Sequence, residues 1–125
     1  MKGNVIMTTT VWNGEKFESL CENQYNVVEI NKLIRKDLIE QFGTNDFKFS
    51  VRKGGRHNII DINVLKMPRK YIDTNNHYGL ETDFHNELIL IANKYLYSEQ
   101  NPFAKHYKSN FCAAAKWAGK AEDLI

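Results

Sequence analysis

The sequence predicts an α+β fold in which two helices pack on a small antiparallel sheet. Two stretches, about 27–42 and 83–97, carry apolar residues at the spacing of a helix. Between them, apolar and polar residues alternate on both sides of a glycine-containing turn, which is typical of a hairpin over 47–52 and 59–65. A further C-terminal strand would complete the sheet.

Length and composition predict one soluble domain. The chain has 125 residues, of which 42% are hydrophobic and 26% charged, enough for a single core. We expect 1–24 to form an N-terminal hairpin or extension and 25–125 to form the α+β body. Cys21 and Cys112 lack metal-ligand spacing, and the N-terminal residues match neither a secretory signal nor a membrane span. We therefore expect reduced thiols, a cytoplasmic protein and no membrane partner.

The first elements follow from local signals. Asn13-Gly14 favours a type I′ turn and so predicts a small N-terminal hairpin. The helix over 27–42 should end at Gly43, a residue common at helix C-caps. Its apolar stripe consists of Ile30, Leu33, Ile34, Leu38 and Phe42.

The hairpin and the second helix are expected to supply most of the core. Pro68 ends the second strand, and a polar loop follows. The "LILIA" centre of the second helix predicts burial on most sides. The residues expected to face the core are Phe47, Phe49, Val51, Ile60, Ile62, Val64, Phe84, Leu88, Ile91 and Tyr95.

The C-terminal segment is compatible with two structures. Asn101-Pro102 could begin a helix, and the three consecutive alanines favour one. Equally, Phe111, Ala113, Ala115 and Trp117 alternate as in a strand.

No catalytic or metal-binding signature is present in the sequence. The histidines do not occur in H-x-x-x-H or H-E-x-x-H, and there is no C-x-x-C. His77, His85 and Asp83 could approach one another, but polar loop residues explain them better. Cys112 lies in an apolar run, which predicts a buried thiol. We therefore expect a non-enzymatic protein without metal or cofactor.

Positive charge is concentrated in one region although the net charge is only +2. Seven basic residues lie in 48–70, against the single acid Asp61. Gly54-Gly55 alone is explained by a turn that needs positive φ, but such a turn does not require cationic neighbours. The candidate partner-binding residues are Arg52, Lys53, Arg56 and His57, joined by Arg69 and Lys70. A secondary basic surface is predicted at Lys105, His106 and Lys108.

Aromatic residues near lysines and arginines allow a second hypothesis. RNA-binding sheets place aromatic side chains on an exposed face beside basic residues. Phe47, Phe49 and Trp117, however, occupy core-like alternating positions. Core packing is the favoured interpretation for most of them.

Residues 25–68 resemble a known family. "KLIRKDL", then "FKFSVR", a glycine turn and "INVLKMP" are similar to the large polyvalent protein-associated domain numbered 29, found in proteins of phages, plasmids and integrative elements. The match weakens after 68, and Lys105-His106-Tyr107 stands where the family has an acidic motif. The resemblance implies the order helix, strand, strand, helix, strand, and so favours a strand in the C-terminal segment. The residues that carry it are Leu33, Ile34, Arg35, Lys36, Leu38, Phe42, Lys48, Phe49, Ser50, Val51 and Arg52.

The resemblance implies a mobile-element origin and no established catalytic residue. With the basic turn, it suggests a binding module that acts as a counter-defence inhibitor, similar to anti-CRISPR proteins. The expected partner is a host defence protein or nuclease complex, RNA-guided ones included, or the nucleic acid that it holds. The alternative is a protein that binds RNA or DNA directly.

Overall fold

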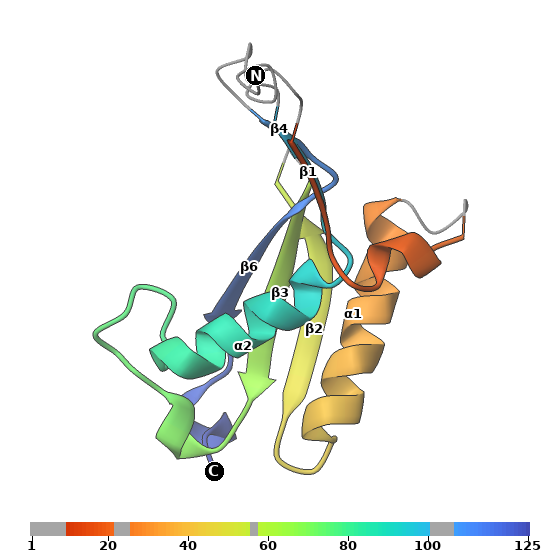
Figure 1. Ribbon diagram of the computed structural model, residues 1–125. Coiled ribbons are helices and arrows are strands. Elements are labelled where there is room, and N and C mark those ends of the chain that lie inside the picture. The colour runs from red at the N-terminus through yellow and green to blue at the C-terminus, as the bar shows by residue number, and fades with distance from the viewer. Residues whose placement is uncertain (1–9, 22–25, 56–57, 101–106) are drawn as a thin grey trace.

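The computed structural model describes residues 10–21, 26–55, 58–100 and 107–125, and it confirms an α+β fold (Figure 1). These residues form two three-stranded sheets, with strand orders β1-β4-β5 and β2-β3-β6, and two α-helices. The elements are β1 (Thr10–Asn13), α1 (Val27–Phe42), β2 (Lys48–Gly54), β3 (Ile59–Lys66), α2 (Thr82–Asn93), β4 (Tyr97–Gln100), β5 (Tyr107–Ser109) and β6 (Cys112–Trp117). Short 3-10 helices are η2 (Phe17–Ser19), η4 (Arg69–Tyr71) and η5 (Ala121–Asp123).

Helix α1 begins and ends where the sequence predicts. The Asn26 side chain accepts a 2.9 Å hydrogen bond from the backbone N–H of Glu29, which caps the first turn. Gly43 adopts a φ of 77°, a conformation that glycine accepts without strain, and its N–H donates to the Ile39 carbonyl. Ile30, Ile34 and Leu38 are fully buried.

The hairpin of β2 and β3 turns the predicted residues toward the core. Phe49 pairs with Val64 and Val51 with Ile62, so their side chains share one face. Phe49 is 6% exposed and Ile62 is fully buried. Gly55, at the turn, has a φ of 61°.

The third strand of this sheet is parallel, not antiparallel as predicted. In β6, Ala113 lies beside Ile60 and Ala115 beside Ile62 of β3, with both strands running in the same direction. Helix α2 lies between these strands in the chain, and parallel neighbours require a crossover of this kind. The sheet β2-β3-β6 is therefore mixed.

The prediction of an N-terminal hairpin at Asn13-Gly14 is wrong. Strand β1 pairs instead with β4, with Asn13 opposite Tyr97. The Gly14 N–H donates a 2.7 Å hydrogen bond to the Leu96 carbonyl, and a side chain at Gly14 would collide with the Asn93 carbonyl. The glycine therefore serves a close backbone contact and not a turn.

Helix α2 is shorter than predicted. It ends at Asn93, and Tyr97 already belongs to β4. Phe84, Leu88 and Ile91 are buried as expected, but Leu90 is 66% exposed. The apolar "LILIA" centre is thus buried on one side only.

The C-terminal segment forms strands, which excludes the helical alternative for the part described. Tyr107–Ser109 is β5 and Cys112–Trp117 is β6. The possible helix start at Asn101-Pro102 lies outside the described residues.

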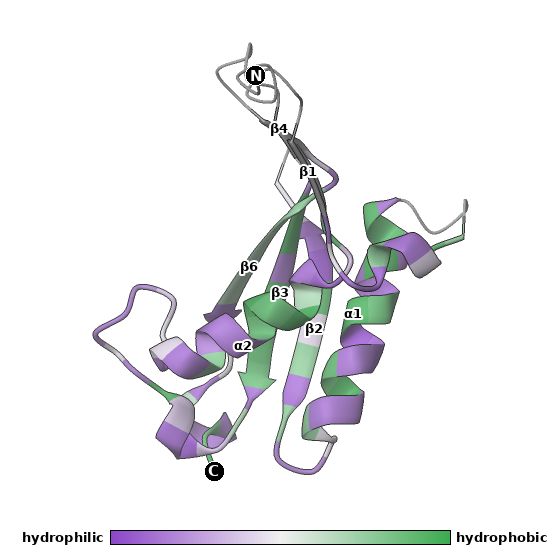
Figure 2. Ribbon diagram, in the orientation of Figure 1, coloured by the Kyte–Doolittle hydropathy of each residue, from purple (hydrophilic) through white to green (hydrophobic). Residues whose placement is uncertain are grey.

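Both helices pack on the same face of the sheet β2-β3-β6, with α1 over β2 and α2 over β6 (Figure 1). Hydrophobic and hydrophilic residues alternate along α1, as expected for a helix with one buried side (Figure 2). An aromatic cluster joins the helices to β2 and η4, and its closest pair is the stack of Tyr71 on Phe84, with centroids 4.5 Å apart. The cluster consists of Phe42, Phe47, Phe49, Tyr71 and Phe84.

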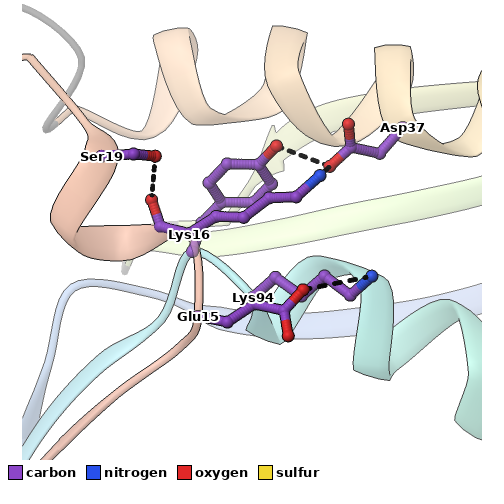
Figure 3. Close-up of polar contacts among 6 residues, drawn as sticks. Glu15, Lys16, Ser19, Asp37 and Lys94 are labelled. Atoms are coloured by element: carbon purple, nitrogen blue, oxygen red, sulfur yellow. Dashed lines mark hydrogen bonds and ion pairs between the residues drawn. The ribbon is translucent and has the colours of Figure 1, made fainter.

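A polar contact joins three distant segments (Figure 3). The Asp37 carboxylate of α1 accepts hydrogen bonds from the Lys16 ammonium at 2.9 Å and from the Tyr95 hydroxyl at 2.5 Å. Nearby, Lys94 pairs with Glu15 at 3.7 Å. Burial first, and then the hydrogen bond and charge of Asp37, raise the pKa of the Tyr95 phenol above its ordinary value of 10.0.

We expect Phe49→Ala to lower the free energy of unfolding by about 3–5 kcal/mol, because it leaves a cavity at a buried site. Urea denaturation followed by circular dichroism measures this change. As a control, Ser50→Ala on the opposite face should change stability by no more than about 0.5 kcal/mol. Similar effects of the two substitutions would contradict the strand register.

We expect stability to fall as the pH rises above about 10, and to fall less steeply in Tyr95→Phe. The unfolded chain releases the Tyr95 proton near pH 10, whereas the folded chain retains it because its pKa is raised. The contribution of the phenol to the free energy of unfolding is therefore complete below pH 10. Above pH 10 it decreases, by at most about 1.4 kcal/mol per pH unit. Other groups titrate in this range, so the informative quantity is the difference between the two proteins in urea melts from pH 8 to 11. Parallel pH profiles would exclude this role of Tyr95.

Candidate partner-binding surface

The face of the sheet β2-β3-β6 opposite the helices is open. Residues that alternate with the buried core positions point to this side, and no described helix packs on it (Figure 1). We call this surface the outer face; it comprises Ser50, Arg52, Asp61, Asn63, Ala114 and Lys116. Of these residues, Arg52, Ala114 and Lys116 are exposed, and the other three are half-buried.

The cations of the outer face are available to a partner. Within the described part of the chain, neither Arg52 nor Lys116 has an ion pair. Asp61 occupies the register position opposite Arg52, but its carboxylate lies against Gly54, where a side chain would collide with it. This contact explains why residue 54 is a glycine although its φ is not positive. At residue 55, the positive φ of the turn explains the glycine.

The predicted hairpin tip is only partly described. Arg52 and Lys53 are exposed at the end of β2. Arg56 and His57 lie outside the described residues.

The buried side-chain amide of Asn31 holds the end of β2 from which the tip extends. Asn31 of α1 is 8% exposed, and its amide is satisfied when its oxygen accepts from the Lys53 backbone N–H at 3.1 Å and its nitrogen donates to the Val27 carbonyl at 3.3 Å. Buried polar groups need such partners. Asn31 therefore fixes the edge of β2 at the point from which the tip extends.

Arg69 and Lys70 do not join the tip. Lys53 pairs with Ile60, near the start of β3, whereas Arg69 follows its far end at Lys66. Ile60 and Lys66 are six residue steps apart along the strand, or about 20 Å at 3.3 Å per residue.

These two residues also have contacts within the chain. The Arg69 guanidinium donates to the Leu124 carbonyl at 3.3 Å, and its backbone N–H donates to Ile125 at 3.0 Å. The Lys70 ammonium lies 5.1 Å from the centre of the Tyr71 ring. Arg69 therefore helps to hold the C-terminal residues in place.

Part of the secondary basic surface lies at the same end of the molecule as the tip. Strand β5, which contains Lys108, is joined by two residues to β6, whose first residue, Cys112, pairs with Ile59 next to the turn. Lys105 and His106 lie outside the described residues, and the same holds for the side chain of Lys108.

Aromatic side chains are absent from the described outer face. Phe49 faces the helices, and Trp117 is half-buried on the same side. Tyr78 stacks on His85, with ring centroids 4.0 Å apart, and His77 forms a T-shaped contact with Tyr78. Among the described residues, no group of three potential ligands could hold a metal ion.

Both cysteines are exposed, so the prediction of a buried Cys112 is wrong. Its apolar neighbours are small alanines, and the register of β6 directs every second residue to the open side of the sheet. Lys116, which lies on the same side of β6 as Cys112 and Ala114, was not among the predicted site residues. In the sequence these three residues alternate with the buried Ala115, and this alternation was the signal that could have placed Lys116 on the open side of the sheet.

Comparison of the chain with family models, curated proteins and solved structures finds no match in any of the three. The resemblance of residues 25–68 to the polyvalent-protein-associated domain therefore stays a prediction. In the ranges that the structure describes, no helix is both long and apolar enough to cross a membrane.

We expect Asn31→Ala to lower the free energy of unfolding by about 1–3 kcal/mol, because it removes the partner of the Lys53 N–H. Amide hydrogen exchange at Lys53 should become faster by a larger factor than exchange in the centre of α1. Lys32→Ala, at the next and exposed position, serves as the control. Unchanged exchange at Lys53 would show that Asn31 does not hold the strand.

Proposed function

We propose that the protein is a non-enzymatic binding module that docks on an acidic macromolecular surface through its hairpin tip and outer face. One observation carries the proposal: Arg52 and Lys53 are exposed at the end of β2 that leads into the turn, without an ion pair in the described residues. A hairpin turn needs its glycine but not these cations. Arginine is also the charged residue most often found at binding hot spots.

The proposed setting is counter-defence. The resemblance of residues 25–68 to domains of phages and integrative elements supports an origin on a mobile element, where inhibition of host nucleases is a common need. Nucleases present acidic residues around their metal ions and hold acidic nucleic acids. A basic module of this size could block such a surface, including that of an RNA-guided nuclease, without any chemistry of its own.

Direct binding of RNA or DNA is the alternative function. The open sheet favours it in outline, because some RNA-binding domains use a sheet surface. The described outer face lacks the aromatic side chains on which bases stack, and it includes the acidic Asp61. These two features favour a protein surface as the partner.

We expect the variant Arg52→Ala/Lys53→Ala/Arg56→Ala to lose binding to its partner while it stays folded. Each desolvated arginine contact contributes 2 kcal/mol or more, on the order of thirty-fold in affinity. The partner would first be identified by pull-down from host lysate and mass spectrometry, and its dissociation constant then measured for parent and variant. Parent binding should weaken as salt increases.

A control variant, Lys36→Ala/Lys70→Ala/Lys120→Ala, removes the same charge from exposed positions away from the tip. It should bind nearly as well as the parent. Equal affinities for parent and tip variant would refute the proposal. Tip-dependent binding to purified nucleic acid alone, with no protein partner needed, would establish the alternative.

A further inference from the structure

A second basic site lies between α1 and β2, at the end of the sheet remote from the tip. A cavity of about 240 Å³ opens there, with Phe47 and Phe49 on its apolar side. Arg35 reaches it from α1, Lys48 from β2 and Lys66 from β3, and Thr44 lies on the connecting loop. Three segments thus bring three cations to one pocket, and no carboxylate of the described residues lines it.

The two lysines occupy an unfavourable arrangement in the free protein. Lys48 and Lys66 are register partners across the antiparallel pair, and like charges at opposed positions destabilise a sheet. The Lys66 ammonium donates to the Asn45 carbonyl at 3.0 Å, which uses one of its three protons. Neither lysine has an ion pair in the described part of the chain.

The acids of α1 lie on its other side. Asp37 and Glu40 line a different pocket, together with Lys16 and Lys94. Because a helix turns 100° per residue, Arg35 and Ile39 share one side of α1 and these acids another. The helix therefore separates its charges and leaves Arg35 free to serve the pocket at β2.

The strand geometry at this pocket is irregular. The register of β2 and β3 shifts between Lys48 and Phe49, so that Leu65 has no partner in the ladder. Such bulges redirect side chains and are frequent beside binding sites. The shift occurs at the point where both lysines meet the cavity.

We propose that this pocket binds a phosphate group. Arg35 offers paired N–H donors that match phosphate oxygens, and the two lysines add charge and further donors. A cavity of about 240 Å³ is smaller than the roughly 300–1,000 Å³ that enclose whole small ligands. It therefore admits the phosphate end of a larger molecule, or the free ion, and not an entire nucleotide.

This site is independent of the proposed docking surface. Lys48 and Gly54 are the two ends of β2, and the six residue steps between them separate the pocket from the tip by about 20 Å. A variant of one site should leave the other unchanged.

The test is an NMR titration of the full chain with inorganic phosphate at constant ionic strength, with chloride as the reference salt. We expect saturable shifts at the amides of Thr44, Lys48 and Lys66. Arg35→Gln and Lys48→Gln should each weaken phosphate binding by about tenfold or more, since each removes a charge-assisted hydrogen bond. Lys36→Gln removes an exposed lysine next to Arg35 in α1 that does not line the pocket and should leave the affinity unchanged.

Two further ligands identify the source of the phosphate. If a 5′-phosphorylated dinucleotide competes with free phosphate and its 5′-hydroxyl counterpart does not, the pocket takes a terminal phosphate. Equal competition by both would indicate backbone phosphates.

Two results would overturn the phosphate site. One is the absence of saturable shifts; the other is a phosphate affinity that Arg35→Gln and Lys48→Gln lower no more than Lys36→Gln does.

Discussion

The structure depends on the single apolar face of the sheet β2-β3-β6. Pairing of the strands in register brings their buried side chains to one side, among them Phe49, Ile62 and Ala115. Since these side chains must leave water together, both helices lie on that side, and a two-layer structure results. The other face needs no cover because its residues are polar, charged or small. The outer face is therefore open as a consequence of how the core is built.

Local patterns predicted α1 and the β2–β3 hairpin because several signals agree there. The apolar stripe and Gly43 specify the same helix, and the structure adds a cap at Asn26. The direction of β6 could not be predicted, because alternation is identical in parallel and antiparallel strands. The Asn13-Gly14 turn failed for another reason: pairing of β1 with β4 and the close approach of Gly14 to the end of α2 override its local preference.

The candidate sites show a similar limit. Charge at the tip could be read from the sequence, since Arg52, Lys53 and Arg56 are neighbours in the chain. The grouping with Arg69 was wrong because β3 carries the chain to the other end of the sheet before that residue. The grouping of Arg35, Lys48 and Lys66, in contrast, was not predicted. They are far apart in sequence, and only the packing of α1 beside the hairpin brings them to one cavity.

The net charge of +2 understates the charge that the protein presents to a partner. Several acids are engaged within the described chain: Asp37 with Lys16 and Tyr95, and Glu15 with Lys94. Cations at the tip and in the pocket have no such ion pairs there, so the charge is only slightly positive overall but concentrated at these two places. At physiological salt, charges are screened over about 8 Å, which is much less than the roughly 20 Å between the sites. Each basic site therefore acts through its own local field, and a partner must reach a site closely to be bound by it.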